Sequence, residues 1–172
     1  MNSKIRLNFY HSLFRTNINK GFTLIELLVV IIILGILSVV ALPNFLRQAG
    51  KAREAEIKQA ISVINRAQQA YHFEKQVFAQ GANDGESLGL LLGVGFNNKY
   101  IDSYNIISNG INSATLSPTN NEYAQDGTRA YSGGTFYNSG GYRAVICQSP
   151  DTAQNITPPV SPTNCGSNER LF

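Results

Sequence analysis

The most prominent feature of the hydropathy pattern is an uninterrupted apolar run from Phe22 to Leu42. It contains 21 residues, and Glu26 is its only charged side chain. As an α-helix, a run of this length would span roughly 30 Å, the thickness of the hydrocarbon core of a bilayer. Helices of soluble domains are rarely apolar on every face over such a length. The run therefore predicts a membrane-spanning helix, and the carboxylate near its start requires a reason.

The helical pattern continues beyond Pro43, but with its apolar residues on one face only. They recur at spacings of three and four, the period of an α-helix. The members of this apolar stripe are Ile57, Ile61, Ile64, Ala67 and Tyr71. Charged side chains are assigned to the other faces, among them Glu54 and Lys58, which are spaced for an i,i+4 ion pair.

Three positions limit or weaken this long helix. Gly81 opens a segment rich in turn-forming residues, so the helix is predicted to end near Gln80. Pro43 has no backbone N–H and Gly50 is a poor helix former. Both are therefore expected to kink or loosen the helix.

The pattern changes to that of strands after residue 103. Segments 104–108 and 111–117 flank Asn109-Gly110, a pair that favours a two-residue hairpin turn of type I′. Further strands are predicted at 128–131, 135–138 and 142–149, separated from one another by the glycine pairs 133–134 and 140–141. Alternating burial favours an antiparallel sheet with one face packed on the apolar stripe. Segment 81–103 is predicted to be a loop with a helical turn at Ser87–Leu92, and the proline-rich tail 150–172 shows no strand signal.

Charge separates the first 21 residues from the others. Lys4, Arg6, Arg15 and Lys20 lie there without an acid, whereas the remaining 151 residues carry 10 basic and all 11 acidic groups. The net charge of these 151 residues is therefore close to zero, which gives no reason to expect nucleic acid as a partner. The basic segment favours a cytoplasmic side for residues 1–21. A conventional signal peptide fits less well, because the apolar run is too long and lacks a small-x-small cleavage site.

The residues available for chemistry are few. The chain has two histidines and two cysteines, and His11 lies in the basic segment. Neither a catalytic constellation nor a phosphate-binding loop is recognisable, so we expect no enzymatic activity, no cofactor and no metal site. His72 lies in the helix and is expected to be either solvated or packed against the sheet.

Cys147 and Cys165 are separated by 17 residues of the tail. In a cytosolic protein, two free thiols would be favoured. Here these residues would lie across the membrane from the basic segment, and a disulfide is favoured instead. It would fasten the tail to the last strand.

The segment KGFTLIE, Lys20 to Glu26, resembles the processing motif of type IV pilins and of the related type II secretion pseudopilins. The shared features are a basic leader that ends in Gly21, a following Phe22, and a glutamate at the fifth position of the mature chain. The resemblance implies that a prepilin peptidase cleaves between Gly21 and Phe22 and methylates the new amino group of Phe22. Pro43 matches the proline that ends the membrane-embedded half of a pilin helix.

The layout as a whole is similar to the type IV pilin fold, an α+β class in which a long N-terminal helix packs on an antiparallel sheet. Within the second half, RAYSGGTFYN and YRAVICQS are similar to pilin-like proteins of the G/H type. The expected parts are a leader (1–21), a transmembrane helix half (22–42), an amphipathic helix half (43–80), a connecting loop (81–103), a sheet (104–149) and a disulfide-bounded tail (150–172).

The resemblance implies a structural subunit of a type IV pilus, held in the inner membrane and then polymerised into a helical surface filament for motility, adhesion or DNA uptake. Its expected partners are further copies of itself, the prepilin peptidase, the pilus assembly machinery and minor pilins. Glu26 is expected to direct assembly by pairing with the methylated amino group of Phe22, either in the same subunit or in a neighbour.

Two alternatives remain at this point. One is a pseudopilin of type II secretion, in which calcium is common; Asp126 and Asp151 are the candidate ligands, although the clustering of a calcium site is absent. The other is a membrane-anchored enzyme or binding module. For the latter, a sugar-binding platform could be built from Tyr123, Tyr131, Tyr137 and Tyr142.

Overall fold

The computed structural model describes residues 21–81, 83–95 and 98–171. The predicted leader therefore lies, apart from Gly21, outside the described residues. The chain divides after Pro43 into two units, the second of which, Asn44–Phe172, we call the head. Helix α2, Leu24–Lys75, contributes residues to both units and contains Pro43. Each unit is described by itself below.

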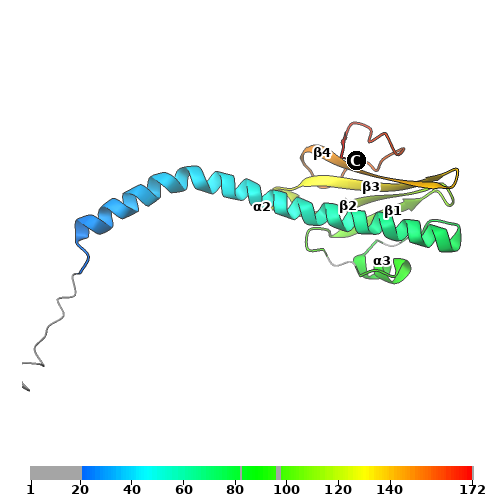
Figure 1. Ribbon diagram of the computed structural model, residues 1–172, viewed down its shortest axis with the longest axis horizontal. Helices are drawn as coiled ribbons and strands as arrows, with labels where there is room; N and C mark the ends of the chain where they lie inside the picture. Colours follow the sequence, from blue (N-terminus) through cyan, green and yellow to red (C-terminus); the bar gives the residue numbers. More distant parts are fainter. Residues whose placement is uncertain (1–20, 82, 96–97, 172) are drawn as a thin grey trace, which may run out of the picture. The chain divides into compact units, whose positions relative to one another are not determined.

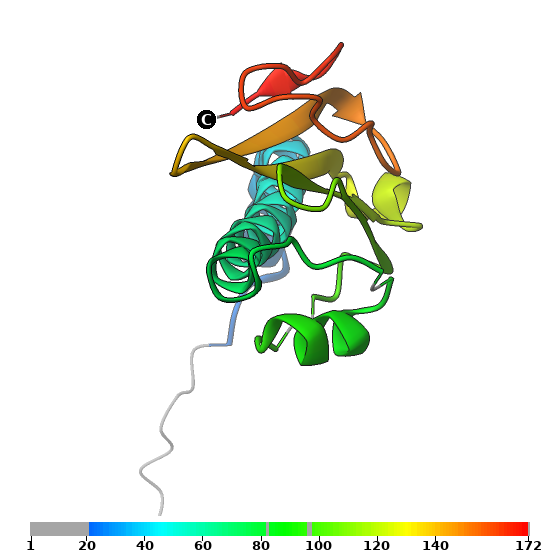
Figure 2. The ribbon, with the colours of Figure 1, turned by 90° about the vertical axis from the view of Figure 1, so that its right-hand side faces the viewer.

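The head contains a five-stranded antiparallel sheet with the order β1-β2-β3-β4-β5. Its strands are β1 (Ser103–Ser108), β2 (Ser113–Thr119), β3 (Arg129–Asn138), β4 (Gly141–Thr152) and β5 (Glu169–Arg170). Two short helices complete it, α3 (Gly85–Leu92) and α4 (Tyr123–Asp126). Within the head, the C-terminal part of α2 lies along one face of the sheet and the tail lies over the other (Figures 1 and 2). The prediction of an α+β pilin-like fold is confirmed.

The core forms where the apolar stripe of α2 meets the sheet, as the periodicity predicted. Ile57, Ile61 and Ile64 are almost fully buried. Residues from every long strand pack against them, namely Tyr104, Ile106, Leu116, Tyr131 and Ile146. α3 adds Leu88 to the same cluster. This helix confirms the helical turn predicted at Ser87–Leu92, and it starts two residues earlier because Asp84 caps it by accepting from the Ser87 N–H at 2.8 Å.

Helix α2 ends at Lys75, five residues before the predicted end. Gln76 adopts a positive φ of 58°, which reverses the chain. The reversal allows Phe78 and Ala79 to be buried, with both backbone polar groups of Ala79 bonded to the Gln68 side chain. Burial of this segment thus ends the helix before the glycine-rich signal at Gly81 is reached.

The register of the first hairpin differs from the prediction. A two-residue turn at Asn109-Gly110 would pair Ser108 with Ile111, whereas Ser108 pairs with Ala114. The observed register places Ile106 opposite Leu116, so both apolar side chains reach the core face. A shift by three residues would place one of the two on the solvent face. The tight two-residue turn occurs instead at Ser139-Gly140, where both φ values are positive.

The glycine pair 133–134 does not separate two strands as predicted, because β3 runs through it. A Cβ on Gly133 would lie 2.4 Å from Cγ2 of Ile61, and a Cβ on Gly134 would lie 2.8 Å from the Phe136 ring and from Pro159. The two glycines therefore let the sheet approach α2 on one face and the tail on the other.

The tail contains more strand structure than its four prolines suggested. β4 continues to Thr152, and β5 adds two residues to the sheet by pairing Arg170 with Cys147 and Glu169 with Gln148. A two-residue strand held beside β4 produces no sequence pattern of its own.

Candidate assembly site

Residues 21–43, the described part of the first unit, are all exposed, and all of them except Thr23, Glu26 and Ser38 are apolar. Phe22, Leu24 and Val39 are among the most exposed of these side chains, at 82%, 82% and 74%. By length and composition, α2 could cross a membrane, and its most apolar 18-residue window has a mean hydropathy of 3.1 with no residue buried. A signal sequence near an N-terminus meets the same criterion. An uncovered apolar surface of this size requires lipid or another protein surface against it.

The start of α2 is fixed by Thr23. Its hydroxyl oxygen accepts the Glu26 N–H at 3.2 Å, and its carbonyl oxygen accepts the Leu27 N–H at 3.2 Å. Thr23 followed three residues later by Glu26 is the sequence pattern of a capping box, a signal that sequence analysis missed. Glu26 therefore lies in the first turn of α2, where the helix dipole favours a carboxylate.

Pro43 and Gly50 do not interrupt α2, which is helical from Leu24 to Lys75. Gly50 is the first buried residue of the helix, and a Cβ there would lie 2.9 Å from the carbonyl oxygen of Gly127, just after α4. Arg53 donates to the Asp126 carbonyl oxygen at 2.6 Å and lies 3.6 Å from its carboxylate. Gly50 thus permits a close contact between α2 and the α4 turn, a role not foreseen from its helix propensity.

We expect Gly50→Ala to lower the stability of the head by about 1 kcal/mol, because a Gly127 backbone atom must move. In an unpacked helix the same change would be stabilising by about 1 kcal/mol. Thermal unfolding followed by circular dichroism shows whether Gly50→Ala lowers or raises the stability of the head. Ala52→Gly, at an exposed position of α2, measures the effect of helix propensity alone. A stabilised Gly50→Ala variant would show that Gly50 only loosens the helix.

Glu54 is buried, contrary to its assignment to a solvated face. One carboxylate oxygen accepts from the N–H and Nε of Arg129 at 3.0 and 3.2 Å; the other accepts from the Tyr131 hydroxyl at 2.8 Å. Burial raises the pKa of Glu54, but these hydrogen bonds together outweigh it and the pKa lies below its ordinary value. The partner of Glu54 is therefore Arg129, while Lys58 lies over the Tyr131 ring.

His72 forms a second polar anchor, at the other end of the packed stripe. Its Nε2 donates to the Ile111 carbonyl oxygen at 2.9 Å, so in the neutral ring Nδ1 accepts from the Tyr142 hydroxyl at 2.8 Å. The ring also packs against Phe78 and Tyr137, with centroids 4.3 and 4.7 Å apart. Of the two expectations for His72, packing against the sheet is the one observed.

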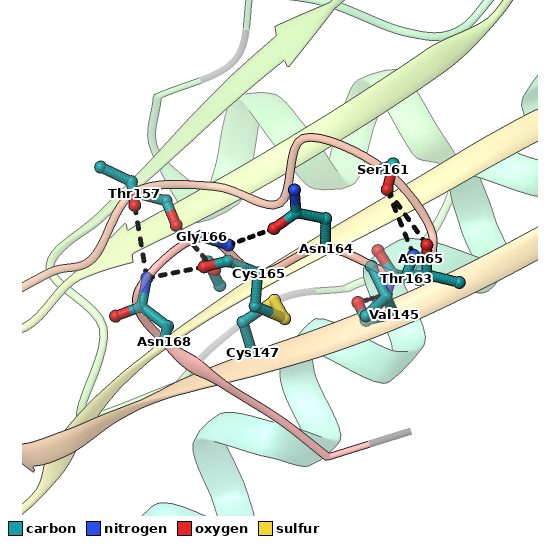
Figure 3. The surroundings of a disulfide bond; sticks show 11 residues. Asn65, Val145, Cys147, Thr157, Ser161, Thr163, Asn164, Cys165, Gly166 and Asn168 are labelled. Atoms are coloured by element: carbon teal, nitrogen blue, oxygen red, sulfur yellow. Dashed lines mark hydrogen bonds between the residues drawn. A yellow bond between two sulfur atoms is a disulfide. The ribbon is translucent and has the colours of Figure 1, made fainter.

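Cys147 and Cys165 form a disulfide with Cα atoms 5.7 Å apart, as expected (Figure 3). Both are buried beside Val145 in a second small core, to which Phe136 and Ile156 add partly buried surface. The tail that the bond closes also carries its own hydrogen bonds, from Asn168 to Cys165 and Thr157.

We expect no alkylatable thiol in the unreduced folded protein and two after reduction. Reduction should lower the stability of the head by about 3 kcal/mol, because the closed loop no longer restricts the unfolded chain. Membrane insertion should not change, since the apolar helix satisfies its own backbone in lipid. Two reactive thiols before reduction, or a dimer that reductant dissolves, would contradict this prediction.

The model of the type IV pilin-like G and H family matches residues 54–169, which is most of the chain and nearly all of the head. The chain belongs to this family. A second model, the prokaryotic N-terminal methylation motif, matches residues 16–42. Both matches confirm the resemblance that the sequence suggested.

Three curated relatives of this pilin-like chain carry pilin or fimbrial names. The type IV major pilin protein PilA of Myxococcus xanthus is 38% identical over 66 residues, which cover 38% of this chain and 30% of the relative. The fimbrial protein of Neisseria meningitidis is 34% identical over 103 residues, 60% of this chain and 58% of the relative. The type IV major pilin protein PilE of Neisseria gonorrhoeae is 31% identical, with coverages of 60% and 59%. The matches thus span from under a third to about three fifths of these relatives, and no solved structure matches the chain.

Membership of a pilin-like family agrees with the expectation that this chain is a structural protein and no enzyme. Among the described residues, no group of three or more His, Cys, Asp or Glu side chains could hold a metal ion. Asp126 is instead bonded to Arg53 and Asn120, and the Asp151 carbonyl oxygen accepts from Ser149.

The four tyrosines considered for a sugar platform of the pilin-like head do not share one surface. Tyr131 is buried against Glu54, Tyr137 and Tyr142 pack around His72, and Tyr123 lies in α4.

Proposed function

We propose that this chain is a structural subunit of a type IV pilus that polymerises through its N-terminal helix. The observation that carries the proposal is the uncovered apolar surface of residues 21–43 in a chain whose head is disulfide-bonded. One apolar surface can meet lipid before assembly and neighbouring helices afterwards. The names of the relatives support a pilin.

In this proposal, the precursor is a single-pass protein of the inner membrane. A prepilin peptidase removes residues 1–21 and methylates the amino group of Phe22, which the match to the methylation motif over residues 16–42 supports. The assembly machinery then transfers the subunit to a surface pilus that contains further copies of it and minor pilins. The chain itself supplies no chemistry.

Glu26 is the proposed assembly residue. A carboxylate in the hydrocarbon layer costs roughly 2.5–3.5 kcal/mol on insertion scales, so an isolated one is unfavourable. Cleavage before Phe22 would create a positive amino group four residues away in the chain. Pairing of this group with the Glu26 carboxylate of a neighbouring subunit would neutralise both charges and fix the axial register.

The segment around Pro43 is the proposed site of local melting during assembly. Pro43 cannot donate to the carbonyl oxygen of Val39, so one helical hydrogen bond is missing there. Residues 21–48 are exposed, whereas Gly50 is buried under the α4 turn. We therefore propose that the helix melts from about Ser38 onward and that the buried contact at Gly50 sets the C-terminal limit of the melted segment.

The test is mass spectrometry of filaments sheared from cells that express the chain. A pilin should be recovered from the filaments with methylated Phe22 as its first residue. Gly21→Leu should accumulate a precursor that keeps the 21-residue leader, while Gly35→Ala, whose Cβ would meet nothing within 4 Å, should be processed normally. Mature protein that begins at Met1 would contradict the proposal. Processed protein confined to the periplasm would indicate the pseudopilin alternative.

A further inference from the structure

A groove of about 440 Å³ lies at the β3–β4 hairpin, between the hairpin and the tail. This volume is within the roughly 300–1,000 Å³ of ordinary ligand sites. Phe136 and Arg143 come from the two strands, Asn138 from the end of β3, and Pro162 from the tail. None of these four residues had a role predicted from the sequence.

The walls of the groove are held by independent constraints. Phe136 and Arg143 are directly opposite in the β3–β4 register, so their side chains share one face of the sheet. The Phe136 ring packs beside the disulfide core and closely covers Gly134. Pro162 lies in a tight turn in which the Asn164 N–H donates to the Ser161 carbonyl oxygen and Val160 N–H to that of Asn164. Figure 3 shows Ser161 and Thr163, the neighbours of Pro162, over the strands.

Two side chains of the groove have hydrogen-bond donors available, whereas the hydroxyls of Ser139 and Tyr142, which also line it, are bonded to Asn138 and His72. Arg143 is the only charged residue of the groove, and within residues 21–81, 83–95 and 98–171 its exposed guanidinium has neither an ion pair nor a hydrogen bond. The side-chain amide oxygen of Asn138 accepts from the Ser139 hydroxyl at 2.9 Å, which leaves the side-chain N–H groups of Asn138 to donate elsewhere. The groove therefore presents two kinds of donor beside an aromatic ring.

We propose that this groove binds an acidic saccharide, a sugar ring that carries a carboxylate. A guanidinium matches a carboxylate with two parallel hydrogen bonds. The Asn138 amide can donate to a hydroxyl, and the flat faces of Phe136 and Pro162 can pack against the C–H face of the ring. A phosphate or sulfate would use the single arginine but not the apolar walls.

The groove lies on the tail side of the sheet, because Phe136 covers Gly134, which faces Pro159, whereas Gly133 faces Ile61 of α2. Binding in this groove does not depend on whether lipid or neighbouring subunits cover the apolar helix. The inference therefore does not rest on polymerisation, and it assigns the head a binding role of its own.

Saturation-transfer NMR on the full chain in detergent micelles, with digalacturonic acid as the probe, tests the proposal. We expect transfer to the ring C–H protons and about tenfold weaker binding to Arg143→Gln, since charge-assisted hydrogen bonds are lost. Phe136→Leu should reduce the transfer. Arg66→Gln, an exposed arginine on α2, should bind like the wild type.

Two further compounds serve as controls. Galactobiose has the sugar rings without the carboxylates, and glutarate has carboxylates without a sugar ring. Binding of galactobiose as tight as that of the acid, or no effect of Arg143→Gln, would overturn the charge assignment. Binding of glutarate as tight as that of the sugar acid would overturn the saccharide assignment. Absence of binding would overturn the proposal itself, without affecting the filament test.

Discussion

Glu26→Ala is expected to insert in the membrane and to be cleaved, yet to form no filaments when it is the sole subunit. Insertion should become easier, because the only charge in the apolar run is removed. Cleavage should continue, because the junction Gly21–Phe22 is unchanged. Assembly should fail, because each incoming Phe22 amino group would meet an apolar layer without a counter-charge.

The experiment compares membrane-bound subunit with sheared filament in one set of cells, by immunoblot. Glu26→Gln is informative because it keeps the size of the side chain and removes the charge, and it should also fail. Ser38→Ala is the matched control. It removes a polar group from the same run, but the Ser38 hydroxyl donates to the Leu34 carbonyl oxygen of its own helix at 2.7 Å, and filament yield should be normal.

A normal filament yield from Glu26→Ala would mean that the glutamate is only tolerated. If Glu26→Ala and Ser38→Ala each form no filaments, the cause is a general packing defect of the apolar run. Only loss of filaments with Glu26→Ala and Glu26→Gln, at unchanged levels of processed subunit, supports a pairing between charges.

The features that sequence predicted are those with a long-range pattern. The apolar run and the stripe of Ile57, Ile61 and Ile64 each repeat over several turns, and both are observed. The β4 strand is also observed, but its burial does not alternate as predicted: Val145, Ile146 and Cys147 are all buried, because α2 covers one face of the sheet and the tail covers the other. The methylation motif was recognisable because a basic leader, a Gly-Phe junction and an intramembrane glutamate must coincide.

The features that sequence missed depend on a single partner elsewhere in the chain. The residues around Gly50 give no sign that Gly127 lies against it, and those around Gly133 give no sign that Ile61 does. The register of the β1–β2 hairpin was wrong because the local turn preference of Asn109-Gly110 is weaker than the burial of Ile106 and Leu116.

Glu54 is a different case, because its position carried a signal. Residues 54, 57, 61, 64, 68 and 72 follow the same spacing of three and four, so Glu54, Gln68 and His72 belong to the buried stripe. All three bond to residues outside α2: Glu54 to Arg129, Gln68 to Ala79 and His72 to Tyr142. A polar residue at a stripe position predicts a specific partner rather than a solvated face.

The burial of Glu54 leads to a predicted loss of stability as large as that expected for reduction of the disulfide. Glu54→Ala leaves the Arg129 guanidinium without its counter-charge and the buried Tyr131 hydroxyl without its acceptor. Removing one partner of such a pair costs about 3 kcal/mol when, as here, the arginine is partly solvated. Such a loss lowers the melting temperature of the head by roughly 10 °C at neutral pH. Exposed Glu56→Ala, two residues away on α2, is the control and should change little.

The pH dependence of the difference in melting temperature between wild type and Glu54→Ala shows whether the loss of stability comes from the charge of Glu54. The pKa of Glu54 in the folded head lies below its ordinary value of 4.5, since hydrogen bonds from Arg129 and Tyr131 favour the charged form despite its burial. The stabilisation is therefore fully present above pH 4.5 and is lost as pH falls through the lower pKa of the folded state. The gap in melting temperature between wild type and Glu54→Ala should narrow on acidification below pH 4.5, while Glu56→Ala follows the wild type. A gap that stays constant to pH 3 would mean that the variant loses packing alone, and that the charge of Glu54 contributes nothing to holding the sheet on α2.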